Sequence, residues 1–225
     1  FESSQTTIDL RSLNAWNLAS TPGNQDDLFP ESSLNNDLAY GYNRAKLAWY
    51  IIDPSLYTVG SAVPENIRND PEITSDQRMR EVLVKEVFPN YSLAQNEARN
   101  LAMFDLAYYP NEPGPYNFDV EGEPGVSAGI SADGELVDPS SRWAGIMRPL
   151  QINNFEEQNI EFIQFWVMDP FYENDNAPDG GDLYFNLGSV SEDILKDGRQ
   201  SFENGIPANG DKTQMDSTHW GYLSE

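Results

Sequence analysis

The sequence of 225 residues contains no cysteine and a single histidine, His219. Without cysteine the chain forms no disulfide, holds no thiolate-bound metal and offers no cysteine nucleophile. A lone histidine removes most histidine-based metal sites and most histidine acid–base schemes. Chemistry of these kinds is therefore excluded, or confined to one position near the end of the sequence.

Basic residues are also scarce. The chain has 13 Lys and Arg against 37 Asp and Glu, which gives a formal net charge of -24. Phosphate binding needs clustered Lys and Arg, so a nucleic-acid surface is excluded. The same sign of charge opposes adhesion to anionic lipid headgroups.

Long apolar runs are missing as well. No stretch has the length and hydrophobicity of a membrane-spanning helix, and none resembles a signal peptide. The motifs GxSxG, GxxxxGK[ST], HExxH and GxGxxG are absent. In contrast, 5 Trp, 11 Tyr and 11 Phe supply bulky packing material, which is atypical of a disordered chain.

The densest run of strand-forming residues is NIEFIQFWVMDPF, residues 159–171. Both faces of the predicted strand carry apolar side chains, so the alternation typical of a half-exposed strand is absent. Asp169-Pro170 ends the run too early for a buried helix. We therefore expect a central strand that is covered on both sides, by another part of the chain or by a partner.

The remaining pattern is mainly that of short strands and turns. A helix is predicted near 76–88, because Met79, Val82, Leu83 and Val87 share one face. Residues 110–140 hold five prolines and five glycines and are expected to form loops and short hairpins. Further strands are predicted at 43–54, 99–109, 142–150 and 183–187, and one helical turn at 191–197.

These elements indicate a mainly β fold, a β-sandwich or jelly-roll-like (galactose-binding-like) module with one or two short helices and long loops. No low-complexity linker divides the chain, so residues 1–225 are expected to form a single compact unit. A subdivision would place an N-terminal decoration with the helix at 1–98 and the β-sandwich core at 99–225.

One loop is a candidate calcium site. Residues 169–182, DPFYENDNAPDGGD, present Asp169, Asp175, Asp179 and Asp182, and calcium prefers such hard oxygen ligands. The spacing does not match an EF-hand, and no glutamate closes the site. A solvated turn is the alternative, and we expect no cofactor outside this loop.

Two further functions can be examined from the residues. Exposed aromatic side chains could stack on sugars in a carbohydrate-binding module, or they could fill the core; the candidates are Trp143, Trp220, Tyr108, Tyr109 and Tyr116. Glycosidases use paired carboxylates, but no local motif distinguishes any pair among the 37 acids. No catalytic residue is assigned.

Five segments together resemble one family. They are NRAKLAWYIIDP (43–54), YYPNEPGPYNFD (108–119), RWAGIMRPL (142–150), NIEFIQFWVMDPF (159–171) and GGDLYFNLGSVSEDILKDGRQSFENGIP (180–207). Their order and spacing resemble the SprA/Sov family of Bacteroidetes, the outer-membrane translocon of the type 9 secretion system, which is linked to gliding motility. Where the family has an arginine, this chain has Pro113, which argues against any ion pair in this loop.

The resemblance implies that this chain is a soluble piece of a much longer protein whose main body is a large β-barrel. It implies a non-enzymatic role in an extracellular cap or accessory domain, at the cell surface, that helps to form or gate the export conduit. The implied partners are the rest of the barrel, the partner subunits of the system and the exported cargo. The family supplies no catalytic residues to transfer, and the alternative remains a carbohydrate-binding β-sandwich of a cell-surface protein.

Overall fold

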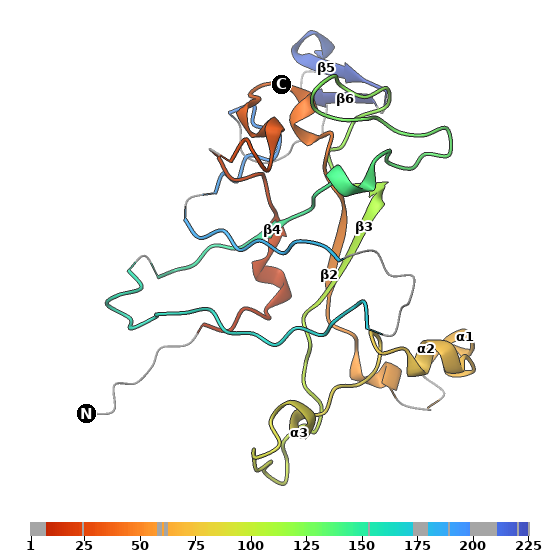
Figure 1. Ribbon diagram of the computed structural model, residues 1–225, viewed down its shortest axis with the longest axis vertical. Helices are drawn as coiled ribbons and strands as arrows, with labels where there is room; N and C mark the ends of the chain where they lie inside the picture. The colour runs from red at the N-terminus through yellow and green to blue at the C-terminus, as the bar shows by residue number, and fades with distance from the viewer. Residues whose placement is uncertain are drawn as a thin grey trace. The chain divides into compact units, whose positions relative to one another are not determined.

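The computed structural model describes residues 8–23, 25–57, 60, 63–152, 154–172, 180–188, 190–198, 211–219 and 221–224 (Figure 1). The strands are β1 (Asn17–Leu18), β2 (Ala45–Tyr50), β3 (Asp105–Pro113), β4 (Ile146–Met147), β5 (Met215–Thr218) and β6 (Gly221–Ser224). The α-helices are α1 (Glu65–Arg68), α2 (Pro71–Ser75) and α3 (Val84–Val87), and several 3-10 turns join these elements. Within the described ranges, no helix is long and apolar enough to cross a membrane.

The strands pair in twos. β1 pairs with β4 and β5 with β6, both antiparallel, and β2 pairs with β3. In Figure 1, β2 and β3 run side by side, and β5 and β6 form a hairpin. Short strand pairs and a few one-turn helices make the described fold mainly β or mixed. The strand predicted at 43–54 is confirmed by β2, and the one at 99–109 is shifted toward residue 113 as β3.

Two predicted strands are wrong. The structure assigns no strand to 159–171 or to 183–187, and neither takes part in the strand pairs of the described chain. Aromatic and branched residues favour extended backbone, but a strand also needs a neighbour that satisfies its amides. The described parts of the chain do not provide the expected cover, because Phe162 is 70% exposed and Val167 is 64% exposed, and cover by a partner stays a prediction. The strand predicted at 142–150 is reduced to β4.

The predicted helix near 76–88 is also largely wrong, because only α3 is helical there. Long-range bonds replace the helical ones: Val84 N donates to Arg99 O at 2.8 Å and Leu101 N to Val82 O at 2.8 Å. The apolar stripe does not reach a core, since Leu83 is 45% exposed. At 191–197 the predicted helical turn is likewise absent, and the Ser191 Oγ instead accepts a bond from Asp193 N at 3.1 Å.

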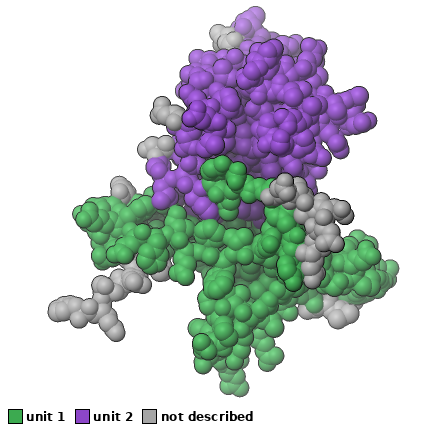
Figure 2. Space-filling view, viewed as in Figure 1, with its two compact units in different colours: residues 1–13, 49–105, 150–184 green, residues 14–48, 106–149, 185–225 purple. Residues whose placement is uncertain are grey.

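The chain divides into two compact units, coloured in Figure 2. Unit 1 comprises residues 1–13, 49–105 and 150–184, and unit 2 comprises residues 14–48, 106–149 and 185–225. Each unit is built from three separate stretches, and both combine residues from either side of the boundary predicted near residue 98. The two units do not coincide with the predicted subdivision near residue 98, and the single-unit prediction stays a prediction.

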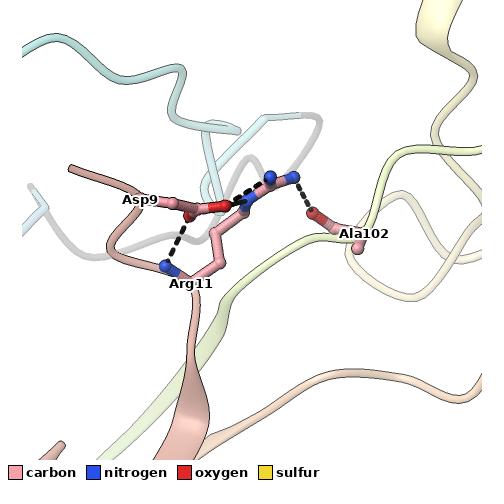
Figure 3. A network of polar contacts seen from close by, with 3 residues as sticks. All are labelled: Asp9, Arg11 and Ala102. Carbon is pink, nitrogen blue, oxygen red and sulfur yellow. Dashed lines mark hydrogen bonds and ion pairs between the residues drawn. The ribbon is translucent and has the colours of Figure 1, made fainter. Parts of the chain in front are cut away.

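A polar network in unit 1 links Asp9 and Arg11 to Ala102. Arg11 Nη2 lies 2.7 Å from Asp9 Oδ2, and Arg11 Nη1 donates to Ala102 O at 3.5 Å (Figure 3). This arrangement ties the start of the chain to the segment that precedes β3. Both charged side chains are more than half exposed, so the ion pair itself adds little stability.

Partial burial of the Asp105 carboxyl group, at the start of β3 in unit 1, destabilises the folded state. Burial raises the pKa of the Asp105 carboxyl above its ordinary value, against a hydrogen bond from the Ile52 backbone that lowers it. The Asp105 Oδ2 atom is buried without a hydrogen-bond partner among the described residues. The folded chain therefore holds the Asp105 proton more tightly than the unfolded chain.

We expect Asp105→Asn to raise the free energy of unfolding at pH 7 by about 1 kcal/mol, because the variant removes a poorly solvated charge. A raised folded pKa means that the folded state binds more protons between the unfolded and the folded pKa. The free energy of unfolding therefore falls as the pH rises from the unfolded pKa to the folded pKa of Asp105. Above the folded pKa the full destabilisation by the buried charge is present. Urea denaturation at pH 7 and at about pH 3 should show a gain only at pH 7. The exposed Asp133→Asn controls for net charge, and an equal gain there would contradict the prediction.

Unit 2 contains most of the described buried side chains. Its apolar members include Ala19, Ala39, Tyr40, Ala45, Leu136, Ile194, Leu195 and Met215. Its buried polar members include Glu31, Asn43, Arg44, Asn117, Asp119 and Arg142. Two arginines in a core of small apolar residues are unusual, because charged side chains are seldom fully buried without partners.

Candidate functional site

Arg44 lies at the centre of unit 2 with an exposed fraction of 0%. Arg44 Nη1 donates to Pro115 O at 3.2 Å, and Nη2 donates to Ile194 O at 3.3 Å. The guanidinium carbon lies 5.2 Å from the centre of the Trp143 ring, within the range of a cation–π contact. One side chain thus joins three segments that are far apart in the sequence.

Trp143 continues this arrangement. Its Nε1 donates to the Oε1 atom of Glu31, which is 1% exposed, and its ring meets Phe29 edge-to-face at 5.8 Å. The main chain beside it pairs with the start of β2, since Ala45 N donates to Trp143 O at 2.8 Å. The indole therefore lies inside a framework of backbone hydrogen bonds.

Arg142 forms a second buried centre. It donates to Tyr42 O at 2.8 Å, to the Asn43 Oδ1 atom at 2.9 Å and to Val137 O at 2.6 Å. Its own carbonyl accepts a bond from the Tyr108 hydroxyl at 2.6 Å. Burial lowers the pKa of the Arg142 guanidinium, an effect that nearby carboxylates partly oppose. Arginine nonetheless stays charged, because its ordinary pKa is far above neutral pH.

Asn117 and Asp119 connect the loop after β3 to the same region. Asn117 Nδ2 donates to Tyr42 O at 2.9 Å and to Arg44 O at 2.8 Å. Asp119 Oδ1 accepts from Gly122 N at 2.8 Å, and its Oδ2 accepts from the Ser127 hydroxyl. We call the set Glu31, Asn43, Arg44, Asn117, Asp119, Arg142 and Trp143 the buried polar cluster.

The hydrogen bonds of the buried polar cluster join separate segments of unit 2. Both guanidinium groups direct donors to main-chain carbonyls, and the two carboxylates accept from an indole, an amide and a hydroxyl. Buried charged groups with such hydrogen-bond partners hold the segments in fixed positions. The loss of one partner would leave the other buried and unpaired, which costs free energy of folding. None of the cluster residues lines the two described hollows. The cluster thus presents no nucleophile or base to either of these two hollows.

The two hollows belong to unit 1 and are shallow. One, of about 320 Å³, is lined by Gln151, Ile152, Asn154, Glu157 and Gln158. The other, of about 230 Å³, is lined by Leu83, Lys85, Leu93 and Arg99. Ligand pockets usually bury most of their ligand and measure about 300–1,000 Å³. Neither hollow brings the paired carboxylates of a glycosidase together.

The aromatic residues proposed for sugar stacking do not form a described platform. Trp143 belongs to the buried polar cluster, and the Tyr108 hydroxyl is bound to Arg142 O. The Tyr109 ring contacts Lys46, whose Nζ lies 4.8 Å from the ring centre, and Tyr109 stays 40% exposed. Tyr116 is half-buried with a positive φ of 60°, and Trp220 lies outside the described residues.

The calcium loop is described only at its ends. Asp175 and Asp179 lie outside the described residues, and Asp169 Oδ1 accepts from Phe171 N at 2.9 Å. Asp182 Oδ2 lies 3.4 Å from the Tyr184 hydroxyl. Within the described ranges, no group of three or more His, Cys, Asp or Glu side chains could hold a metal ion. A calcium site in 169–182 stays a prediction of the sequence.

Chelation separates the two alternatives for this loop. We expect excess EDTA to leave the melting temperature unchanged within about 1 °C, because a solvated turn contributes no metal-binding free energy to the folded state. Differential scanning calorimetry with EDTA, and with added Ca²⁺ as the control, measures this. A melting temperature that rises with calcium and falls with chelator would establish a site.

Sequence reasoning missed the buried polar cluster. A signal was present, because the charged residues Arg44 and Arg142 lie next to apolar, strand-forming residues within segments predicted to be strands. A cation inside such a segment either faces water or finds buried acceptors. Deciding between these requires the positions of Pro115 and Ile194, which the sequence does not supply.

The predicted absence of an ion pair near Pro113 can also be compared with the structure. Lys46 Nζ lies 2.5 Å from the Oε2 atom of Glu112, so this loop does carry an ion pair, made by β2 and β3. Both side chains are about half exposed, which limits the contribution of the pair to stability.

In comparisons with known proteins, no family model matches the sequence and no curated protein matches it significantly.

Proposed function

We propose that this chain is a non-enzymatic structural domain of a type 9 secretion outer-membrane translocon, in its extracellular cap or an accessory position. The domain helps to form or gate the conduit for exported proteins. Its partners are the rest of the barrel, the other subunits of the system and the cargo, and its location is the outer membrane at the cell surface.

The observation that carries this proposal is the place of the resembling segments in unit 2. Segments 43–54, 108–119, 142–150 and 180–207 each contribute to the contacts of Arg44: Arg44 itself, the Pro115 carbonyl, the Trp143 ring and the Ile194 carbonyl. What the chain shares with the family is thus what builds the core of this unit. Residues used in this way support a structural role rather than catalysis.

We also propose that the strand pairs belong to a β-sandwich or jelly-roll that is completed by further polypeptide. Two-stranded pairs are marginal by themselves, and additional strands or cover usually stabilise them. The exposed run at 159–171 supports this proposal, because its residues favour strands and it takes no part in the described strand pairs. The carbohydrate-binding alternative lacks a described aromatic platform.

A secretion assay tests the function. Arg44→Met is introduced into the full-length protein of a Bacteroidetes cell, with Lys46→Met on the same strand as the matched control. We expect loss of cargo in the medium and of gliding for Arg44→Met, and near-normal secretion for Lys46→Met. Surface abundance of both variants is measured by antibody. Normal secretion by cells that lack the whole domain would overturn the proposal.

A glycan array with the purified chain addresses the alternative. Saturable sugar binding that is lost on replacing Tyr108 or Tyr109 would favour a carbohydrate-binding module over a translocon domain. We expect no such binding, because the hydroxyl of Tyr108 and the ring of Tyr109 are already engaged within unit 2.

A further inference from the structure

Residues 82–101 of unit 1 form a loop whose two ends are joined by main-chain hydrogen bonds. Val84 N donates to Arg99 O at 2.8 Å. Leu101 N donates to Val82 O, also at 2.8 Å. α3 lies near the start of this loop, and the chain then turns back on itself (Figure 1). Compact surface loops whose ends lie close together are frequently functional. We call residues 82–101 the α3 loop.

One hollow is lined by residues of the α3 loop. It measures about 230 Å³, and its lining residues are Leu83, Lys85, Leu93 and Arg99. Leu83 is 45% exposed, Leu93 is half-buried, and both cationic side chains are exposed. Lysine and arginine lay their hydrocarbon stems along apolar surface and keep their charged ends in water. The hollow therefore combines an apolar lining with two positive charges at its edge.

The two cations at this hollow lack partners. The side chains of Lys85 and Arg99 have no hydrogen bond, ion pair or ring contact with any residue that the structure describes. Every other Lys and Arg side chain in the described ranges has at least one such contact. This is notable in a chain with 37 acidic residues against 13 basic ones. The two described cations without a partner thus line the same hollow.

The acidic residues of the α3 loop, Glu86 and Glu97, do not neutralise these cations. Glu86 Oε1 accepts from Arg80 Nη2 at 2.5 Å. Glu97 Oε1 accepts from the Tyr91 hydroxyl at 2.7 Å, and its Oε2 accepts from Ala94 N at 3.1 Å. Both carboxylates are therefore engaged elsewhere, and the positive charge at the hollow stays available to an anion from another molecule.

We propose that the hollow of the α3 loop binds an acidic segment of another polypeptide, in which an apolar side chain such as Leu lies next to Asp or Glu. The apolar side chain contacts Leu83 and Leu93. The neighbouring carboxylate accepts hydrogen bonds from Lys85 and Arg99. Arginine can hold a carboxylate through two parallel N–H donors, and lysine adds a point charge. This site goes beyond the proposed function and does not depend on it.

The size of the hollow favours a polypeptide over a small molecule. Pockets for small ligands usually measure about 300–1,000 Å³ and bury most of the ligand. This hollow is smaller, and its lining residues are mostly exposed. A single anchoring side chain fits such a space, and a polypeptide gains the rest of its affinity from surrounding contacts. The α3 loop offers apolar surface for them, since Phe88 is 42% exposed and Tyr91 is 48% exposed.

Charge argues against other macromolecules. Anionic membranes and nucleic acids are bound by clusters of many Lys and Arg, whereas Lys85 and Arg99 are the two cations that line this hollow. A second copy of the chain carries its own net charge of -24, which opposes its approach. A polypeptide whose negative charge is confined to the residues at the hollow avoids most of this repulsion.

NMR titration of the purified chain with synthetic peptides tests the proposal. The probe is a short Gly-Ser peptide that carries Leu beside Asp, and in the matched peptide Asn replaces Asp. We expect the Asp peptide to shift the methyl resonances of Leu83 and Leu93. We also expect it to bind about tenfold more tightly than the Asn peptide, because the Asn peptide lacks the charge-assisted hydrogen bond. The difference should shrink in about 1 M salt.

Charge variants locate the effect. Lys85→Gln with Arg99→Gln should weaken binding of the Asp peptide about tenfold and leave binding of the Asn peptide unchanged. The matched control is Arg68→Gln with Arg78→Gln, which removes two cations of unit 1 that already have carboxylate partners. This control should bind as the unmodified chain does. Leu83→Ser should weaken the binding of both peptides, and circular dichroism verifies that each variant is folded.

Several results would overturn the inference. They are equal binding of the Asp and Asn peptides, methyl shifts that spare Leu83 and Leu93, and unchanged binding by the double variant of Lys85 and Arg99. Octanoate or inorganic phosphate that binds at the hollow as tightly as the Asp peptide would assign the site to a small anion instead. Self-association in sedimentation velocity that disappears in the double variant would assign it to a second copy of the chain.

Discussion

Replacing Arg44 by methionine should lower the free energy of unfolding by about 3–5 kcal/mol, because it removes one partner of a buried, charge-assisted network. The Pro115 and Ile194 carbonyls lose donors at 3.2 Å and 3.3 Å, and each orphaned acceptor costs about 1–3 kcal/mol. The contact with Trp143 is lost as well. Urea denaturation monitored by tryptophan fluorescence measures the change.

The matched control lies two residues away on the same segment. Lys46→Met removes an exposed cation whose ion pair with Glu112 is open to solvent, so the unfolding midpoint should scarcely move. Arg44→Lys keeps the charge but loses the planar fork that reaches two carbonyls, so an intermediate loss is expected. Similar midpoints for Arg44→Met and Lys46→Met would show that burial of Arg44 does not matter for stability.

Gly114→Ala should cost about 3 kcal/mol. A Cβ atom on Gly114 would lie 2.4 Å from the Ala45 oxygen and 2.7 Å from the Ala45 carbon. Both are backbone atoms of β2, and Gly114 N donates to Arg44 O at 3.0 Å. Neither segment can therefore move away without breaking this hydrogen bond. The change in unfolding free energy is measured by urea denaturation at pH 7.

Gly23→Ala provides the comparison within unit 2. Nothing lies within 4 Å of a Cβ at Gly23, and its backbone is not in the left-handed region. An alanine there restricts the unfolded chain and should be neutral or stabilising by up to about 1 kcal/mol. If both glycine variants behave alike, the close approach of Gly114 to Ala45 is not a determinant of this fold.

Local sequence predicted part of the fold well. β2 follows from the apolar, branched and aromatic residues of 43–54. The loops and short hairpins expected at 110–140 include a turn at Asp133-Gly134, where Gly134 N donates to Ser131 O at 3.0 Å. The residue preferences behind both predictions are local, although β2 is paired with the distant β3. The predicted helix failed where long-range bonds of Val82 and Val84 replaced helical ones.

The candidate site was less accessible from the sequence. The composition excluded cysteine chemistry and most histidine chemistry. Its excess of negative charge also argued against a surface that binds nucleic acids. It could not show that Trp143 would be engaged by Glu31, which lies far away in the sequence, rather than exposed to a sugar. Nor could it show that the Tyr109 ring would contact Lys46. Contacts between side chains that are distant in the sequence are determined only by the tertiary fold.

The residue types alone excluded cysteine chemistry and most histidine chemistry. They also determined the strongly negative net charge and the positions of the strand-forming runs. Tertiary contacts determined that Arg44 and Arg142 are buried while Phe162 and Trp166 are exposed, which reverses the order expected from hydrophobicity. The physical reason is pairing. A guanidinium can be buried where carbonyls from distant segments converge on it, and an apolar side chain is buried only where another segment packs over it.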